Sequence, residues 1–88
     1  PDAPDAKAFL WLCRPYDGAP ATAGNGTMLA LTASKRAQVD AVHTAALAAG
    51  GRCEGQPGLR DYAPHFYAAY FRDLDGNKLA VVCTAAEV

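Results

Sequence analysis

One amphipathic helical segment with a strong stop signal limits what this chain can form. Residues 35–49 consist largely of strong helix formers, and apolar residues recur on one face at helical spacing: Val39, Val42, Ala46 and Ala49. Ser34 precedes the segment at the N-cap position, where its hydroxyl would accept a hydrogen bond from a first-turn amide. Gly50 and Gly51 follow it, and glycine adopts the left-handed C-terminal conformation without a Cβ clash. A helix of this kind needs a partner surface on one side only.

Short apolar runs on both sides of the helix predict that this partner is a β-sheet. Four buried or half-buried strands are expected, at residues 7–14, 27–33, 66–72 and 78–84. A turn between the last two is predicted at 73–77, with Gly76 placed to take a positive φ. Residues 52–65 are rich in glycine and proline, so they are expected to be irregular, with at most a short strand. The order from residue 27 is strand, helix, short strand, strand, turn and strand, an α+β arrangement.

The composition excludes several classes of function. The formal net charge is -1 and the basic residues are scattered, so no basic stripe is available to bind nucleic acid. No apolar run approaches the length of a membrane span. Three cysteines without paired spacing argue against a disulfide framework and favour a reducing, cytoplasmic location. The alternative is a single bridge between Cys13 and Cys83, which occupy matching places on two expected strands.

A short internal repeat suggests how the chain is divided. KAFLWLC (7–13) and NKLAVVC (77–83) align with their cysteines superposed, and a linker rich in Gly, Pro and Ala follows the first copy. We interpret residues 1–26 as the last strand of a first unit plus a linker, and residues 27–88 as a complete second unit. In this alignment the first-unit position equivalent to Ala80 is Leu10.

Several stretches together resemble the C-terminal module of a known superfamily. They are GNG (24–26), SKRAQVDAVHTAALAAGG (34–51), PGLR (57–60), HFYAAYFRDLDGN (65–77) and LAVVC (79–83), while FLWLCRPYDGAPATAGNG (9–26) is similar to the end of the first module. The superfamily is that of glyoxalase, bleomycin-resistance and dioxygenase proteins, also called the vicinal-oxygen-chelate superfamily. The resemblance implies a βαβββ module with a curved mixed sheet and one main helix. It also implies a cup, built from two such modules, that holds a divalent metal ion.

The sequence departs from this family at the metal ligands. The family's His, Glu or Gln ligands correspond to Met28, Ala80 and Leu10, and the fourth position would lie upstream of Pro1. These side chains offer no nitrogen or oxygen ligand, and a thioether is poorly suited to the hard or borderline ions that the family uses. We therefore expect no metal and no other cofactor, and the sequence identifies no catalytic residue.

A ligand-binding face is nevertheless expected on the sheet. Four residues would share one strand face by the period of two and line a cup that suits an apolar or aromatic small molecule: Met28, Ala30, Ala80 and Val82. Arg60 is a candidate for holding an anionic ligand group. His65 and Tyr67, near Tyr62, are candidates for lining the pocket, with the imidazole as an acid or base. The expected function is small-molecule binding, with the reaction, if any, unknown.

Two other functions stay open. The same face would suit a non-catalytic structural or dimerisation module, and a metal-dependent lyase or dioxygenase would need ligands from outside this chain. An uncovered apolar face predicts either a homodimer or a missing N-terminal module, with Trp11 and the aromatic strand at residues 66–72 near the contact. The remaining titratable residues have simpler expected roles: His43 packs on the helix, and Asp73 and Asp75 form a turn.

Overall fold

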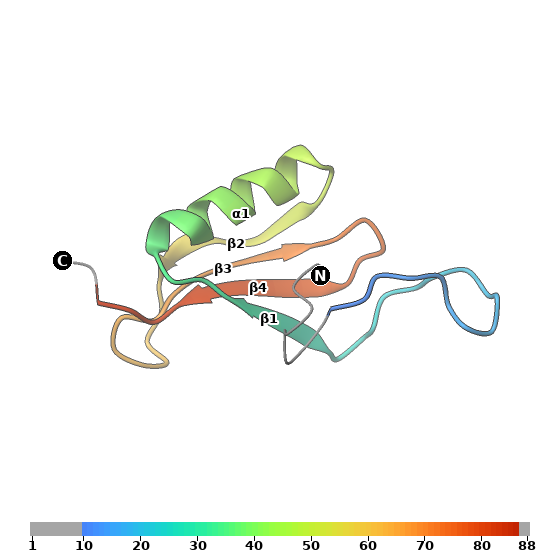
Figure 1. Ribbon diagram of the computed structural model, residues 1–88, viewed down its shortest axis with the longest axis horizontal. Coiled ribbons are helices and arrows are strands. Elements are labelled where there is room, and N and C mark those ends of the chain that lie inside the picture. The colour runs from blue at the N-terminus through green and yellow to red at the C-terminus, as the bar shows by residue number, and fades with distance from the viewer. Residues whose placement is uncertain (1–9, 87–88) are drawn as a thin grey trace, which may run out of the picture.

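A computed structural model describes residues 10–86 of the chain. Its elements are β1 (Met28–Thr32), α1 (Arg36–Ala48), β2 (Arg52–Leu59), β3 (Tyr67–Arg72) and β4 (Lys78–Cys83). The strands form one sheet in the order β1–β4–β3–β2, and α1 lies along one side of it (Figure 1). This is the expected βαβββ module, with a mixed sheet and one main helix.

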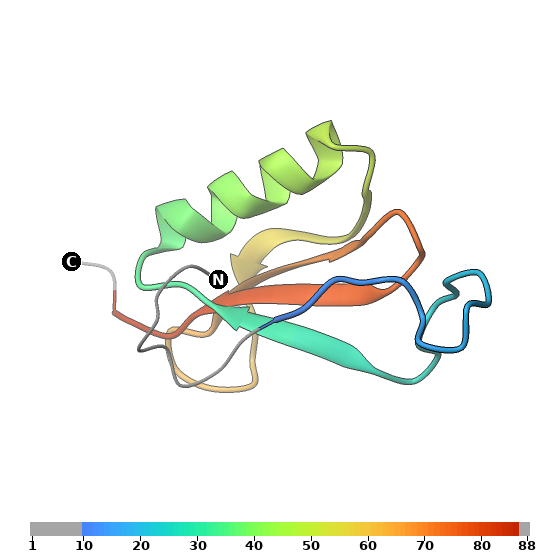
Figure 2. The ribbon, with the colours of Figure 1, turned by 45° about the vertical axis from the view of Figure 1, so that its right-hand side comes forward.

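The strand pairing gives the sheet two distinct faces. β1 runs parallel to β4, whereas the β3–β4 and β2–β3 pairs are antiparallel. The register aligns Ala30 with Ala80, and Ala80 with Tyr70. Because side chains alternate along a strand, residues aligned in this way point to the same side of the sheet. One side packs against α1, and α1 leaves the other side uncovered (Figure 2).

The core lies between α1 and the two central strands. Its buried residues are Val39, Ala69, Phe71, Val81 and Cys83, with Ala33, Val42, Ala46, Tyr67 and Leu79 packed around them. Burying each large side chain of this kind stabilises the fold by about 1.5–3 kcal/mol. The predicted apolar helix face is thus confirmed for Val39, Val42 and Ala46. Ala49 was wrongly included, because it is the C-cap residue and its side chain is exposed.

A glutamine, and not the predicted serine, organises the start of α1. The N-cap is Lys35, one residue later than expected. Gln38 reaches back from the third helical position, and its Oε1 accepts hydrogen bonds from Ser34 N (2.8 Å), Ser34 Oγ (2.9 Å) and Lys35 N (3.2 Å). The predicted role of Ser34 was therefore wrong, since its hydroxyl donates to Gln38 and does not accept from a first-turn amide.

Two glycines end α1 in a Schellman motif, as the sequence predicted. Gly50 N donates to Leu47 O (3.1 Å), and Gly51 N donates to Ala46 O (2.9 Å). Gly50 has a φ of 106°, a conformation that L-residues with a side chain rarely adopt. A Cβ on Gly51 would lie 2.7 Å from Arg72 O and 2.9 Å from Ala46 O, so no larger residue fits there.

The strand β2 is longer and more regular than the sequence suggested. Arg52–Leu59 pairs with β3 along its length, whereas residues 52–65 were expected to be irregular. Two register shifts, between Cys53 and Gly55 and between Gly55 and Gly58, absorb the residues that disfavour a regular ladder. Pro57 lies inside the second shift, where its missing N–H removes no regular ladder bond. Local residue propensities thus underestimated how far pairing with β3 stabilises the strand β2.

Residues 7–14 were expected to form a strand, and the structure describes residues 10–14 of this range. These residues do not form a strand. Residues 10–14 have no regular secondary structure, and the Trp11 side chain is 73% exposed. Residues 7–9 lie outside the described residues. A strand needs a hydrogen-bonded neighbour, and the sheet formed within residues 10–86 does not include this segment. The division of the chain after residue 26 stays a prediction.

The end of α1 provides a test of this packing. We expect Gly51→Ala to lower the free energy of unfolding by about 1–3 kcal/mol, because the added methyl would push against two fixed carbonyl oxygens. Gly58→Ala is the matched control: the nearest atom to its Cβ is Arg60 Nη1, 3.1 Å away, which is a side-chain atom and not a backbone oxygen, so we expect a smaller loss. Urea unfolding followed by circular dichroism measures both. Equal losses in the two variants would contradict the packing described for Gly51.

Candidate functional site

Alternate residues of β1, β3 and β4 form the side of the sheet that α1 leaves uncovered, here called the cup face. They are Met28, Ala30, Thr32, Ala68, Tyr70, Arg72, Lys78, Ala80 and Val82. The four residues predicted to share a face therefore lie on one side. Their exposure differs, because Met28 is 49% exposed whereas Ala80 is 1% exposed. Ala80 lies opposite the larger Tyr70, so it forms part of the floor beneath other side chains.

A hollow of about 520 Å³ opens on this face, between the sheet and the β2–β3 loop. Its lining residues are Met28, Glu54, Arg60, Tyr62, Phe66, Tyr70 and Lys78. The loop connects the end of β2 to the start of β3 and lies on the side of the sheet away from α1 (Figure 1). Within it, the rings of Tyr62 and Phe66 meet edge to face with centroids 5.3 Å apart. The hollow thus combines aromatic rings from the loop and the sheet with charged side chains.

Two glycines of β2 make room for Arg60 on the cup face. Arg60 donates from Nη1 to Gly58 O and from Nη2 to Gln56 O, each at 2.8 Å. Its guanidinium carbon lies 5.4 Å from the centre of the Tyr70 ring. A Cβ on Gly55 would lie 2.9 Å from Tyr70 Cδ2 and 3.2 Å from Arg60 Nη2. The absent side chain at Gly55 therefore lets the arginine and the tyrosine ring approach each other.

Lys78 approaches the same tyrosine from β4. Its Nζ lies 5.4 Å from the centre of the Tyr70 ring, within the range of a cation–π interaction. The acid in the hollow, Glu54, pairs with Arg72, whose Nε lies 3.1 Å from Glu54 Oε1. Each member of this pair is about one third exposed, so we expect the pair to contribute at most about 1 kcal/mol. Its effect on the site is to compensate the negative charge of Glu54.

Five of the seven predicted pocket residues are outside the lining of this hollow: Ala30, Ala80 and Val82, which lie elsewhere on the cup face, and His65 and Tyr67. His65 is exposed in the β2–β3 loop and has a φ of 60°, in the left-handed region. Tyr67 packs against the core on the α1 side of the sheet, where its hydroxyl donates to Asp40 Oδ1 at 2.6 Å. The Arg36 guanidinium carbon lies 5.3 Å from the same ring. Tyr67 therefore joins the sheet to the helix, and a ligand contact by either residue stays a prediction.

His43 is a packed residue of α1, as expected. It is 3% exposed, and its Nε2 has no hydrogen-bond partner among the described residues. Asp73 also has the expected turn role, because its Oδ1 accepts hydrogen bonds from the backbone N of Asp75 (3.0 Å) and of Asn77 (2.8 Å). The three cysteines are unpaired in the structure, and Cys83 is buried whereas Cys13 and Cys53 are exposed.

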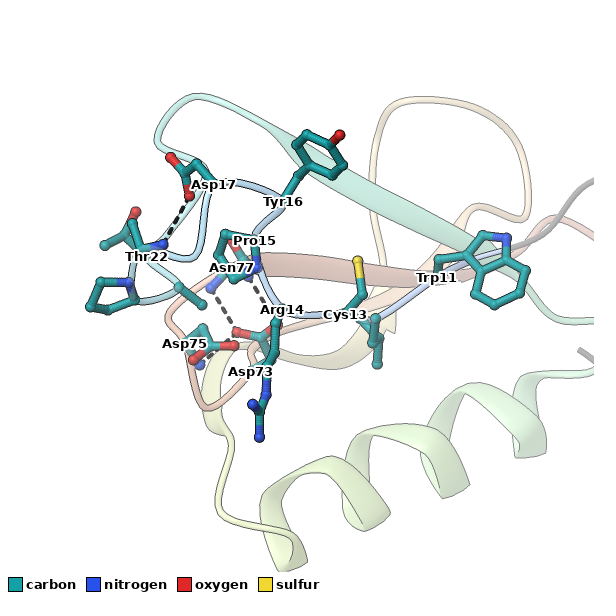
Figure 3. Close-up of a pocket in the computed structure, with 14 residues that line it drawn as sticks. Trp11, Cys13, Arg14, Pro15, Tyr16, Asp17, Thr22, Asp73, Asp75 and Asn77 are labelled. Carbon is teal, nitrogen blue, oxygen red and sulfur yellow. Dashed lines mark hydrogen bonds between the residues drawn. The ribbon is translucent and has the colours of Figure 1, made fainter.

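A second hollow, of about 510 Å³, lies between the linker and the β3–β4 turn. Figure 3 shows its polar side, where Asp73, Asp75 and Asn77 lie beside the segment from Trp11 to Thr22. The linker approaches this turn through Gly24 N, which donates to Asn77 Oδ1 at 2.6 Å. One wall of the hollow consists of residues 11–22, a segment without regular secondary structure.

The donors present do not fit the metal that the resemblance implies. Met28 and Ala80 lie on the cup face, where the family ligands would be, and neither supplies nitrogen or oxygen. Leu10, the third equivalent, is outside any strand. Across residues 10–86, no three His, Cys, Asp or Glu side chains gather closely enough to hold an ion. Over the same range, no helix has the length and apolar character needed to cross a membrane.

Sequence reasoning missed most of the residues that surround the hollow. Tyr70 and Lys78 carry the same period-two signal as Ala80, since both stand at alternate positions of β3 and β4. That signal would have added them to the predicted face. Glu54 and Phe66 gave no such signal, because their positions depend on a bulge in β2 and on the path of a loop.

Comparison with known proteins gives a mixed result. No protein-family model and no curated protein matches the chain. Among solved structures, a glyoxalase/bleomycin resistance protein from Albidiferax ferrireducens T118 is 46% identical with a TM-score of 0.72, and the match covers 81% of this chain and 57% of that one. A hypothetical protein from S. aureus is 29% identical with a TM-score of 0.61, covering 67% of this chain and 44% of its own.

A third solved structure agrees with the first. It is a glyoxalase/bleomycin resistance protein/dioxygenase family enzyme from Burkholderia phytofirmans PsJN, 25% identical with a TM-score of 0.64, and the match covers 73% of this chain and 49% of that one. The chain thus spans about half the length of the solved structures that it matches. The identity of 46% and the shared βαβββ architecture show that this chain belongs to the glyoxalase/bleomycin-resistance/dioxygenase superfamily.

Proposed function

We propose that this protein binds a small aromatic or apolar molecule in the hollow of the cup face, without help from a metal. One observation carries the proposal: three aromatic rings and a methionine surround a single hollow on the uncovered side of the sheet, namely Tyr62, Phe66, Tyr70 and Met28. Pockets for small molecules are typically lined by apolar and aromatic side chains with a few polar groups, and they have volumes of roughly 300–1,000 Å³. The hollow on the cup face matches this description.

The position of the hollow supports the same function. On the sheet side it is lined by Met28 of β1, Tyr70 of β3 and Lys78 of β4, which are register neighbours across three adjacent strands or lie two residues from one. The wall is a loop, whose Tyr62 and Phe66 rings support each other edge to face. Aromatic rings on both the sheet and the loop side favour binding of planar ligands by stacking.

A neutral aromatic probe tests this function. We expect 2-naphthalenemethanol to bind the purified protein, and Tyr70→Leu to weaken its binding by about threefold to tenfold, because leucine retains apolar volume but removes the stacking surface. Tyr16→Leu is the matched control, since Tyr16 lies exposed in the linker. Chemical shift changes and their titration by NMR measure both affinities. An unchanged affinity in Tyr70→Leu, or an equal loss in Tyr16→Leu, would argue against the proposed site.

A metal-dependent reaction of the family type is the less supported alternative. Such a reaction requires nitrogen or oxygen ligands from both modules, and the residues at the corresponding positions of this chain do not provide them. Ligands for a metal would have to come from elsewhere.

The metal content of the protein separates these alternatives. After exposure to Fe²⁺, Mn²⁺, Zn²⁺ and Ni²⁺ followed by desalting, we expect each metal to be far below stoichiometric amounts, because Met28 and Ala80 cannot replace a His and a Glu. Elemental analysis by mass spectrometry gives the ratio of metal to chain. A stoichiometric ion whose retention is lost in a Met28→Ala variant would overturn this expectation.

A role in assembly is a second candidate function, and we infer it from the exposed apolar residues at one end of the sheet. Leu10, Leu12 and Leu29 are exposed and line a common apolar hollow that also includes Leu79. Within residues 10–86, β1 pairs only with β4, so its outer edge has no neighbouring strand. Exposed strand edges beside apolar side chains favour pairing with another chain or module. We propose a homodimer, or pairing with a second module of the same type. We also propose a cytoplasmic location, in which the exposed Cys13 and Cys53 stay reduced.

Sedimentation equilibrium tests the dimer at micromolar concentration. We expect a dimer, and Leu29→Glu should shift it toward the monomer, because a charge would enter the apolar contact beside β1. Leu74→Glu makes the same change at an exposed leucine in the β3–β4 turn, and it should leave the association unchanged. A stable, cooperatively folded monomer of the unmodified protein would contradict the proposed homodimer.

A further inference from the structure

Arg60 and Lys78 place two positive charges on one aromatic ring. The guanidinium carbon and the ammonium nitrogen each lie 5.4 Å from the centre of the Tyr70 ring. Arg60 comes from the residue just after β2, and Lys78 from the first residue of β4, so the two neighbours of β3 each contribute one cation. Both residues line the hollow of the cup face. Like charges in one hollow repel each other, and an anion bound in the hollow would relieve this repulsion.

No carboxylate among the described residues compensates these charges. Arg60 donates its two resolved hydrogen bonds to backbone carbonyl oxygens, and no ion pair joins Arg60 or Lys78 to an acidic side chain within residues 10–86. Glu54 is the one acid of the lining, and Arg72 already pairs with it at 3.1 Å. The positive charge of the hollow therefore exceeds its negative charge.

Arg60 is held in position before any ligand arrives. Two of its five N–H groups bind the carbonyl oxygens of Gly58 and Gln56, which leaves three donors for a further partner. Gly55 and Gly58 leave the space that the side chain occupies, since a Cβ on either would come within 3.2 Å of its nitrogens. A side chain that is already ordered loses little conformational entropy on binding, so this arrangement favours capture of an anionic group.

We propose that Arg60 and Lys78 form an anion subsite, so that the natural ligand is an aromatic or apolar molecule carrying a carboxylate or phosphate. This inference rests on the proposed function and adds the charge of the ligand. The ring of such a ligand contacts the aromatic side chains of the hollow, and its anionic group is bound by the two cations. Carboxylate and phosphate share the same recognition chemistry, because both accept charge-assisted hydrogen bonds from arginine and lysine.

Three probes with the same ring system test the subsite: 2-naphthoate, 2-naphthyl phosphate and the neutral 2-naphthalenemethanol. We expect at least one anionic probe to bind the protein about tenfold more tightly than the alcohol, the size typical of a hydrogen bond to a charged group. Whichever anion binds more tightly identifies the carboxylate or phosphate class. Raising the salt concentration should weaken the anionic probes and leave the alcohol unchanged.

Charge-removing variants assign the effect to the two residues. Lys78→Gln and Arg60→Gln should each reduce the preference for the anion by about threefold to tenfold, while the affinity for the alcohol stays the same. Arg60→Lys keeps the charge but loses the fork of donors, and we expect an intermediate loss. Lys35→Gln is the control, because Lys35 caps the helix and lies on the other side of the sheet. Lys78→Gln keeps the test valid if Arg60→Gln fails to fold.

The possible results separate this inference from the function on which it rests. If none of the three probes binds, both the proposed function and the anion subsite are wrong. If the alcohol binds as tightly as the anions, or if Lys78→Gln weakens anion binding no more than Lys35→Gln does, the anion subsite is wrong while the aromatic pocket stands. A preference for the anion that is lost in Lys78→Gln supports the subsite.

Discussion

The packing of α1 against β3 and β4 determines the side of the sheet to which each side chain of these strands points. Ala69, Phe71, Val81 and Cys83 occupy alternate positions and contact the helix, so the residues between them must point the other way. A shift of one residue would turn Tyr70 of β3, or Lys78 of β4, toward the helix and expose the present core residues of the same strand. Because burial of the core strongly disfavours such a shift, it also holds the cup face in its register. The aromatic and charged groups of that face are therefore placed by residues on the opposite side.

The same constraint explains how the site differs from the metal centre of its family. At the family's ligand positions, this chain carries Met28 on β1 and Ala80 on β4. The polar and aromatic groups that line the hollow are instead Lys78, two residues before Ala80 on β4, Tyr70 on the neighbouring β3, and Arg60 just after β2. The register of the sheet fixes which residues share its uncovered side, and the type of interaction available there depends on a few residues along it. In the function proposed for this protein, stacking and charge take the place of metal coordination.

Much of the fold followed from the sequence, because its signals are local. Helix periodicity, the glycines after residue 49 and the alternation in β3 and β4 each reflect contacts within a few residues. The prediction failed where a segment depends on a distant partner. β2 contains Gly55, Pro57 and Gly58, and only its pairing with β3 makes it a strand. The segment at residues 10–14 has strong β propensity but no partner strand in the described chain, and it remains irregular. Arg60 was identified as a candidate ligand-binding residue, yet its position beside Tyr70, in space left by two glycines, depends on tertiary structure.

The parallel pairing of β1 with β4 has a consequence for the order of folding. The helix and the two antiparallel pairs involve segments close in sequence, whereas Met28 aligns with Lys78 from the far end of the module. Closing so long a loop costs more chain entropy, so β1 is expected to dock after the rest of the sheet has formed. Until then, the edge of β4 stays open beside a formed core, and the β1 of a second molecule fits it as well as the molecule's own. High protein concentration during refolding therefore favours exchange of β1 between chains, a domain swap whose hinge lies at residues 33–35.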